Sequence, residues 1–436
     1  MSNTHHDEEP SQSSSDGALG LEGLLAWTQA RYVARTAATP LRTVAARLDE
    51  AHGCILAHAL TSPYDEPFAD AAAYDGYAVC GEGPWIIVDL AHDVALSPHT
   101  AMRVRTKQIL PGHTDAVLRA DRGALETHDS LERVTALDPL TDLPEPTARP
   151  DFGSGIMRQG TIRTAGTELV HAHSPVTAGT LALAAAAGLD TLDVIKPPVV
   201  GTLVLGSSLL TSGPARDGRV RDALGLTIPA LIGSLGARAN PPVRAPDTRE
   251  LLYQEIDDAN VDMLITTGST SPEGNNILRE ALRDLNVHWL IDGIMATPGS
   301  QTLLVRLPDG RLLLGLPGHP ADALAGLLTL GAPLIAGLRG ELIDHVTPSA
   351  VPPRGKLTDS VAAPEFEDDT RICPVRLLPT GVSGDAIPAA VPLPVDGPAD
   401  LGGWATADAI AVIPPGKTTA GAVVELLDTG GRPATS

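Results

Sequence analysis

The strongest constraint on the fold is a strand–turn–helix pattern in residues 261–285. The unbroken apolar run Met263–Ile265 is typical of a short strand that is covered on both faces, as in a parallel sheet. A turn of small polar residues follows: Gly268, Ser269, Thr270 and Ser271. After it, apolar residues recur at helical spacing: Ile277, Leu278, Ala281, Leu282 and Leu285. Such a turn presents N–H groups and hydroxyls at the positive end of a helix, where phosphate binds. Taken alone, the stretch is equally consistent with a phosphate-binding turn and with a structural turn that binds no ligand.

The same pattern occurs on both sides of this stretch. The apolar run Val199–Leu205 leads into the turn Gly206–Ser208, and Leu312–Leu316 leads into Pro317–Pro320. A helical pattern follows each turn, at residues 223–235 and 321–330. Such units in series form an open, mostly parallel sheet through right-handed crossovers, and ligands bind beyond the carboxyl ends of its strands. We therefore expect the three turns to converge on one ligand site.

The charge of the chain restricts its partners. A length of 436 residues predicts about three domains, and a hydrophobic fraction of 43% is enough for real cores. The formal net charge of −22 repels nucleic acid and anionic membranes, which are therefore poor partners. A polyanionic ligand would need a divalent cation or local arginines to neutralise its site.

Cysteine spacing and apolar runs indicate a reducing cytoplasm. Cys54, Cys80 and Cys373 lie far apart without a CxxC pair, which argues against a zinc site or a disulfide framework. The polar, acidic N-terminus is not typical of a secretory signal. The longest apolar stretch that we identify, Leu181–Leu189, is too short to span a bilayer.

The first half of the chain mixes helical and turn-rich patterns. Residues 1–18 lack apolar periodicity and are predicted to be a disordered tail. Helical patterns are predicted at Leu21–Tyr32 and Thr43–Leu60. Asp75-Gly76 before alternating apolar residues is typical of a hairpin turn in which Asp75 bonds its own backbone. The alternative is a carboxylate presented at a domain edge, and the pattern favours the turn.

The remaining segments predict two β domains and one helix. Residues 80–150 are valine-rich and broken by turns, which favours a small β domain. Ala178–Ala187 is a helical pattern ended by Gly188. Residues 341–436 are proline-rich with strand-like runs, which favours a small terminal β domain or barrel.

Five segments occur in the order of a known family. They are Asp75–Val79, Arg163–Glu168, Leu205–Leu209, Gly268–Ser271 and Leu316–Pro320. With these segments the chain resembles the molybdopterin molybdenumtransferase family, which includes the E domain of gephyrin. The order of landmarks along the chain matches that family from about residue 20 to 428. The resemblance implies a multidomain α/β fold. Its open, mostly parallel α/β domain of the molybdopterin-binding type is joined by a linker domain, an inserted small β domain and a C-terminal β-barrel-like domain.

The domain boundaries follow from placing these parts on the sequence. The N-terminal tail is residues 1–18, and the elongated linker domain is 19–60 plus 151–196. The inserted β domain is 61–150, the α/β molybdopterin-binding domain is 197–340, and the C-terminal β domain is 341–436.

The resemblance also implies a reaction. Family members insert molybdate into adenylylated molybdopterin with release of AMP, in a magnesium-dependent step of molybdenum cofactor biosynthesis. They are homodimers whose site lies between the α/β domain of one subunit and the Asp75 region of the other. A pterin or nucleotide ligand, Mg²⁺ and proteins of the same pathway are therefore the implied partners.

The resemblance assigns roles to particular residues. Catalytic roles fall to Asp75, Thr106 and Glu168, with Asp75 and Glu168 as ligands of magnesium. Ligand binding falls to the three turns and two further positions: Gly206, Ser207, Ser208, Asp222, Gly268, Ser269, Thr270, Ser271, Asn276, Pro317, Gly318, His319 and Pro320.

Several family positions carry different residues here, mostly neutral in place of charged. Ser207 and Ser208 replace two acids, and Asn276 replaces a third. Gly293 and Thr297 replace two lysines. Three further substitutions exchange one side chain for another, namely Glu168 for aspartate, His319 for asparagine and Pro398 for serine. Each lost donor or ligand typically raises a barrier by about 2–4 kcal/mol, unless Arg219, Arg221 or Arg244 compensates.

Two hypotheses of function follow. The first is an enzyme that inserts molybdate with an altered site. The second is a catalytically inactive paralogue that binds molybdopterin or a protein partner as a carrier, scaffold or regulator. A nucleotide-binding enzyme of other specificity is disfavoured because neither a Walker A motif nor a GxGxxG fingerprint occurs. The survival of Asp75 and of an acid at position 168 favours the first hypothesis.

Overall fold

The computed structural model describes residues 23–89, 94–128, 130–245, 248–273, 276–341, 353–362, 368–378, 387–397 and 399–429. Ala45–His52 and Leu56–Val194 form one compact unit, here called the inserted unit. The other described residues form a second, the core unit. The predicted tail at residues 1–18 and the substituted position Pro398 lie outside the described residues.

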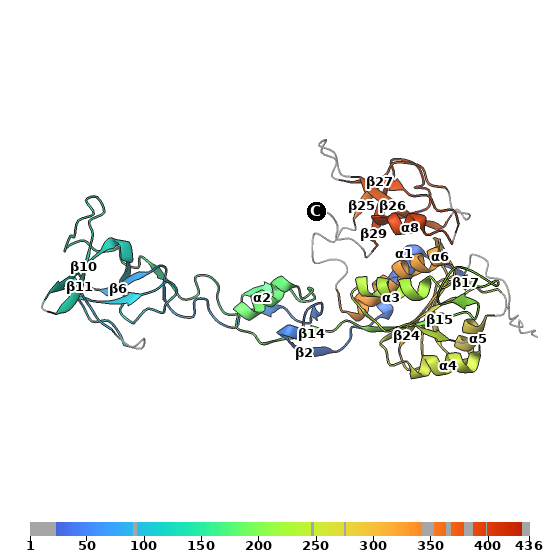
Figure 1. Cartoon of the computed structure of the whole chain (residues 1–436), viewed down its shortest axis with the longest axis horizontal. Coiled ribbons are helices and arrows are strands. Elements are labelled where there is room, and N and C mark those ends of the chain that lie inside the picture. The colour runs from blue at the N-terminus through green and yellow to red at the C-terminus, as the bar shows by residue number, and fades with distance from the viewer. Residues whose placement is uncertain are drawn as a thin grey trace, which may run out of the picture. The chain divides into compact units, whose positions relative to one another are not determined.

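The core unit is built on the predicted open sheet (Figure 1). Strand β15 (Val199–Leu205) pairs in parallel with β20 (Met263–Thr267), which pairs in parallel with β24 (Leu312–Leu316). The edges are formed on one side by β18 (Arg238–Ala239) and β19 (Val243–Ala245), and on the other by the antiparallel β23 (Leu303–Arg306) and β21 (His288–Asp292). The sheet is therefore mostly parallel, as the apolar runs predicted.

Helices cover both faces of this sheet, which explains why its strands are continuously apolar (Figure 1). Ile265 and Leu314 face one core and Leu264 and Leu313 face the other. The first core is packed by α1 (Trp27–Ala37), α3 (Leu224–Ser234), α6 (Pro320–Gly326) and α7 (Ala332–Leu338). The second is packed by α4 (Arg249–Asp258) and α5 (Ile277–Asp284).

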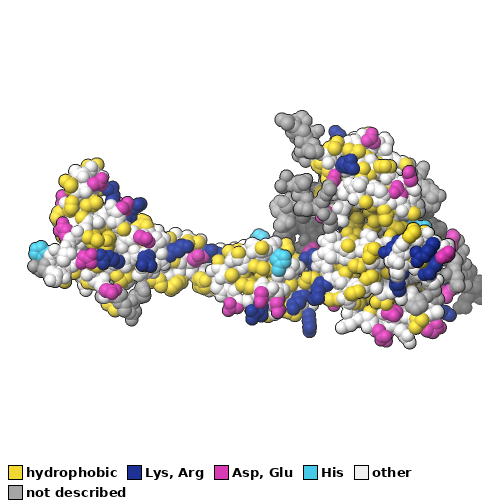
Figure 2. All heavy atoms as spheres, in the orientation of Figure 1, with side chains coloured by type: hydrophobic (Ala, Val, Ile, Leu, Met, Phe, Trp, Pro, Cys, Tyr) yellow, Lys and Arg dark blue, Asp and Glu magenta, His cyan; other side chains and the backbone are white. Residues whose placement is uncertain are grey.

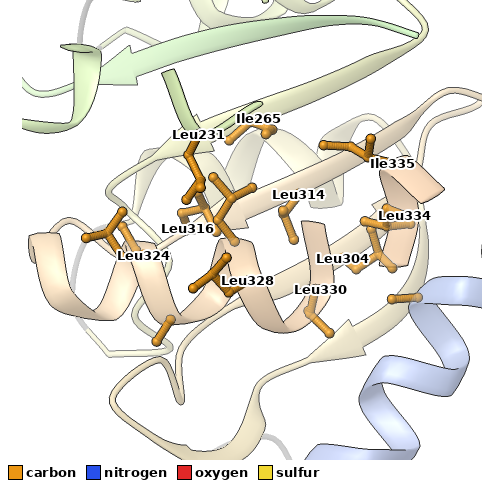
Figure 3. Packing of buried hydrophobic residues seen from close by; sticks show 14 of the residues in the cluster. Leu231, Ile265, Leu304, Leu314, Leu316, Leu324, Leu328, Leu330, Leu334 and Ile335 are labelled. Atoms are coloured by element: carbon orange, nitrogen blue, oxygen red, sulfur yellow. The ribbon is translucent and has the colours of Figure 1, made fainter. Parts of the chain in front are cut away.

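The helix after the third turn continues beyond its predicted end. A π-helical turn, η4 (Leu327–Gly331), joins α6 to α7, so that Pro320–Leu338 is one helical segment. Arg31 donates from Nη1 to the carbonyl of Leu328 at 2.9 Å, and Trp27 Nε1 donates to Thr329 Oγ1 at 3.2 Å. This segment is long and apolar enough to cross a membrane, but 83% of its apolar window is buried in the protein. Its side chains point at Ile265 and Leu314 of the sheet (Figure 3), as those of a core helix do.

The C-terminal part of the core unit contains the predicted barrel. Five strands close on themselves in the order β26-β27-β25-β29-β28, because β28 also pairs with β26. They are β25 (Arg354–Leu357), β26 (Thr370–Leu378), β27 (Ala389–Pro392), β28 (Ala409–Ile413) and β29 (Val423–Asp428). A short helix that the sequence did not indicate, α8 (Gly402–Thr406), precedes β28, and β26 also pairs with β22 (Ile294–Thr297).

The inserted unit contains a six-stranded sheet in the order β10-β11-β7-β8-β6-β9. Its strands are β6 (Gly76–Cys80), β7 (Trp85–Ile87), β8 (Thr100–Val104), β9 (Ala116–Arg119), β10 (Gly123–His128) and β11 (Leu131–Ala136). Buried side chains pack on both faces of this sheet, for example Met102 on one and Trp85 on the other. The valine-rich segments therefore form a β structure, as expected.

One predicted helix is wrong and another is shifted. Residues 43–61 form β2 (Thr43–Arg47), a 3₁₀ turn (Leu48–Glu50), β3 (Ile55–Leu56) and β4 (Leu60–Thr61) instead of a helix. Their apolar spacing matched a helical period by coincidence, whereas β14 (Thr191–Ile195) lies between β2 and β3 and supplies the backbone partners. The helix expected to begin at residue 21 begins at Trp27. The predicted alanine-rich helix is present as α2 (Ala178–Ala186).

Candidate functional site

The structure brings the three turns of the core unit together at the carboxyl edge of the sheet. The strand ends are in register, since Val204 pairs with Thr267 and Thr267 with Leu316. Gly268 donates its N–H to the carbonyl of Leu316 at 2.8 Å. A Cβ atom added at Gly318 would lie 3.6 Å from Gly268 Cα. The second and third turns therefore approach each other closely at Gly268 and Gly318.

The second turn has an unusual backbone. Gly268 has φ +89° and Ser269 has φ +57°, so two successive residues adopt the left-handed region. Successive residues of this kind direct neighbouring N–H groups into a concavity that suits an anion. A Cβ atom added at Gly268 would lie 3.5 Å from the carbonyl oxygen of Leu205, so the end of β15 also reaches this turn.

Asn276 places an unused acceptor beside the same turn. It precedes α5, and its side chain is 7% exposed. Asn276 Nδ2 donates to the carbonyl of Ser271, which identifies the nitrogen of the amide. The other amide atom, Oδ1, is buried and has no partner among the described residues. A buried unpartnered acceptor costs free energy until a donor reaches it.

Arg279 supports the turn, and sequence reasoning missed it. Its side chain is 4% exposed, its Nε donates to the carbonyl of Thr270 at 2.7 Å, and Nη2 lies 2.6 Å from Asp292 Oδ1. The guanidinium also lies over the ring of Trp289, 5.6 Å from its centroid. The sequence gives no signal for this role, because a charged residue in the first turn of a helix normally faces solvent.

The third turn leads into α6 with His319 as the N-cap residue and Pro320 at the first position. Asp322 accepts the N–H of Gly299 at 2.7 Å and so ties a neighbouring loop to this helix. Burial raises the pKa of Asp322, while its bond to Gly299 opposes the rise. His319 itself is exposed.

The positions of the missing family lysines are structural here. Gly293 has φ +99°, and a Cβ atom there would lie 2.4 Å from Leu24 Cδ2. A lysine therefore does not fit at Gly293 without movement of Leu24. Thr297 donates from Oγ1 to Asp369 Oδ2 at 2.7 Å, which fastens this segment to the barrel.

The first turn is surrounded by arginines. It leads into a two-stranded ribbon, β16 (Leu209–Leu210) with β17 (Val220–Arg221). Arg219 donates from Nη2 to the carbonyls of Ser207 and Leu209, at 3.3 and 3.1 Å. Asp222 is 6% exposed and already paired, because it accepts from the N–H of Gly225 at 2.9 Å and from Arg244 Nη2 at 2.5 Å.

Asp75 and Thr106 form a pair in the inserted unit. Asp75 Oδ1 accepts from the backbone N–H of Thr106 at 2.7 Å and from its hydroxyl at 2.9 Å. These two bonds hold the pKa of the Asp75 carboxyl below its ordinary value. The side chain is exposed, and it remains ionised at neutral pH.

The expectation that Asp75 belongs to a hairpin turn and bonds its own backbone is wrong. Strand β6 begins at Gly76 and pairs with β8 and β9, both of which come from later in the chain. A Cβ atom at Gly76 would lie 2.1 Å from the carbonyl oxygen of Leu118, so close strand packing requires this glycine. The Asp75 side chain is exposed, and the alternative interpretation, a carboxylate presented at a domain edge, remains a prediction.

Glu168 lies apart from the Asp75–Thr106 pair. It begins β13 (Glu168–Val170), which pairs with β4 in a different sheet from β6, and it forms an ion pair with His171. Among the described residues, no hydrogen bond or ion pair joins Glu168 to Asp75. The two proposed magnesium ligands therefore belong to different sheets of the inserted unit.

The described residues do not show the magnesium site that the resemblance implies. Mg²⁺ requires oxygen ligands, usually one or two carboxylates together with substrate phosphates. In the described part of the chain, no group of three His, Cys, Asp or Glu side chains could hold a metal ion. At the first turn Asp222 is already used by Arg244, and the adjacent positions carry Ser207 and Ser208. Magnesium remains a prediction.

Two family models match the chain in succession. Residues 25–188 match the MoeA N-terminal region (domain I and II), and residues 201–337 match a probable molybdopterin binding domain. The second match contains the three turns. The first contains Asp75, Thr106 and Glu168.

Relatives and solved structures agree with these matches. The molybdopterin molybdenumtransferase of Staphylococcus aureus (strain MSSA476) is 26% identical over 332 residues, which is 72% of this chain and 75% of the relative. That of Staphylococcus epidermidis (strain ATCC 12228) is 26% identical over 320 residues, or 69% of this chain and 72% of the relative.

Solved structures show the fold. A molybdopterin biosynthesis MoeA protein from Pyrococcus horikoshii is similar with a TM-score of 0.72 and 22% identity, over 94% of this chain and 100% of that one. A second structure from the same organism has a TM-score of 0.65 and 18% identity, over 93% of this chain and 100% of that one. With both family models matched in order along it, the chain belongs to the MoeA family of molybdopterin molybdenumtransferases, which act in molybdenum cofactor biosynthesis.

Proposed function

We propose that this chain inserts molybdate into adenylylated molybdopterin and releases AMP. The observation that supports this most strongly is the meeting of three polar turns at the carboxyl edge of β15, β20 and β24. Ligands of open α/β sheets bind at this edge. The family membership of the chain supplies the pterin as the ligand class.

In this proposal the second turn holds the phosphate end of the ligand. The left-handed backbone of Gly268 and Ser269 directs N–H groups toward an anion, and Arg279 keeps Thr270 in place from behind. Asn276 Oδ1 is an acceptor that has no partner among the described residues, which suits an N–H group of a pterin.

In this proposal Asp75 supplies a negative charge to the site. The chain acts as a homodimer in the cytoplasm, and Asp75 of the partner subunit reaches the turns of the core unit. Because Thr106 lowers the pKa of Asp75, the carboxylate stays ionised and cannot donate a proton at neutral pH. It acts as a fixed acceptor that orients the reacting group. If light scattering finds a monomer at micromolar concentration, a site shared between two subunits cannot form, and this part of the proposal is wrong.

The competing hypothesis is a paralogue that binds the pterin without turnover. Two observations favour it: Asp222 is already paired with Arg244 and with the N–H of Gly225, and a lysine at Gly293 would require Leu24 to move. Binding of phosphate by the turns does not require either group. This hypothesis therefore predicts affinity for the ligand without chemistry.

Reconstitution separates the two hypotheses. Purified protein is incubated with adenylylated molybdopterin and molybdate, with and without magnesium, and AMP is quantified by chromatography over time. Multiple turnovers of AMP per subunit support the enzyme. Stoichiometric binding of the adenylylated ligand without AMP release supports the carrier role.

A further inference from the structure

Four arginines gather around the end of β15. We call Arg216, Arg219, Arg221 and Arg244 the arginine cluster. Arg221 lies on β17, opposite Leu210 of β16, and Arg244 lies on β19, opposite Val204 of β15. All four side chains are at least partly exposed, and Figure 2 shows basic side chains gathered near the position labelled β17 in Figure 1.

Most of this cluster has no carboxylate partner. In the described part of the chain, Arg244 is paired with Asp222, but no ion pair involves Arg216, Arg219 or Arg221. Their guanidinium groups donate only to backbone carbonyls, such as that of Leu210, which accepts from Arg221 at 3.3 Å. A guanidinium has five N–H donors, so most remain available. Like charges that are held together and left unneutralised repel one another.

A small pocket opens beside the cluster. Its volume is about 180 Å³. It is lined by Val204, Thr211, Arg221, Asp222, Gly225, Leu226, Pro242 and Arg244. Pockets that bury a whole small molecule typically measure about 300–1,000 Å³. The pocket therefore suits a single anionic group of a ligand better than a whole pterin.

We propose that the arginine cluster binds a phosphate group of the nucleotide half of the ligand directly, without a divalent cation. This inference deepens the proposed function and rests on its ligand class. Ionised carboxylates of Asp and Glu bind a phosphate only through an intervening cation. A guanidinium binds phosphate oxygens directly through paired N–H groups. The first turn carries Ser207 and Ser208 with arginines beside it, so it offers donors to an anion rather than carboxylates to a cation.

Titration calorimetry on the full-length protein tests this inference. AMP and inorganic pyrophosphate are the probes, each in EDTA and in magnesium. We expect both to bind in EDTA and to bind more weakly as salt rises, because exposed charges are screened over about 10 Å at 0.1 M ionic strength. Arg219→Gln and Arg221→Gln should each weaken binding about tenfold or more. Arg221→Lys should lose less, because it keeps the charge.

The control is Arg238→Gln. Arg238 is exposed and pairs with Val199, at the opposite end of β15. This variant tests whether the loss of any exposed arginine, wherever it lies, weakens binding. Binding that requires magnesium, or that Arg221→Gln and Arg238→Gln weaken equally, would overturn the inference. Circular dichroism confirms that each variant is folded.

The outcomes also separate this inference from the proposed function. If AMP binds in EDTA and depends on the arginines while the protein releases no AMP from the adenylylated ligand, the inference is supported and the proposed enzymatic function is contradicted. If turnover depends on magnesium and is unchanged in Arg219→Gln and Arg221→Gln, the enzymatic function is supported and the inference is contradicted.

Discussion

Gly268→Ala should weaken binding of the phosphate end of the pterin ligand while leaving the protein folded. Gly268 has φ +89°, and the new Cβ atom would lie 3.5 Å from the carbonyl oxygen of Leu205, at ordinary van der Waals distance. The substitution therefore introduces strain but no clash. A non-glycine residue in the left-handed region costs about 1–2 kcal/mol. Against a typical stability of roughly 5–15 kcal/mol, about 99% or more of the molecules stay folded.

The effect on binding should be larger than this cost suggests. Relief of the strain turns the N–H groups of the second turn away from the phosphate. Each hydrogen bond to a charged group is worth about 1.5–3 kcal/mol, which corresponds to roughly a tenfold to hundredfold loss of affinity. The affinity for adenylylated molybdopterin is measured by calorimetry, and stability by urea denaturation.

Gly310→Ala is the matched control. Gly310 has φ +91° with nothing within 4 Å of an added Cβ, and it lies just before β24, at the other end of the sheet. It should suffer the same strain without any effect on binding. If Gly268→Ala binds adenylylated molybdopterin as the unchanged protein does, or if both variants lose affinity equally, the second turn has only a structural role.

Three further predictions follow from named contacts. Thr106→Val removes the hydroxyl donor to Asp75, so the pKa of Asp75 should rise toward its ordinary value in a carbon-detected NMR titration; an unchanged pKa would contradict the hydrogen bond. Arg279→Met leaves the carbonyl of Thr270 unpaired and should cost about 1–3 kcal/mol of stability in urea denaturation; no shift in the urea midpoint would contradict the bracing role. The three cysteines are buried, and burial raises the pKa of Cys373 to about 11, so the native protein should resist a thiol reagent at pH 8 and react fully only in denaturant. Rapid native labelling would contradict that burial.

The central sheet could be predicted from the sequence because its strands are buried on both faces. The runs Val199–Leu205 and Leu312–Leu316 are β15 and β24 with unchanged bounds, since turn residues end each apolar run abruptly. Residues 43–60 could not be predicted in the same way. Their apolar spacing fits both a helical period and a strand period. The strand that decides between the two, β14, lies more than a hundred residues later.

The candidate site was predictable in its backbone but not in its side-chain partners. A run of small residues such as Gly268–Ser271 indicates a turn, and the structure shows Gly268 in the left-handed region. The partner of Asp75 is Thr106, which is 31 residues distant, and only the pairing of β6 with β8 brings the two together. Arg279 gave no signal, because its charge alone predicts exposure and the buried carbonyl that it binds is visible only in the folded chain.

The central claim is that this altered site still performs chemistry, and Asp75→Asn tests it most directly. The variant keeps the shape of the side chain and the acceptor for Thr106 but removes the charge. AMP release from adenylylated molybdopterin with molybdate is followed for both proteins, together with ligand binding. We expect the unchanged protein to release AMP, and Asp75→Asn to bind the ligand with similar affinity but release AMP about a hundredfold more slowly. If neither protein releases AMP while both bind the ligand equally, the chain is a binding protein and the catalytic account is wrong.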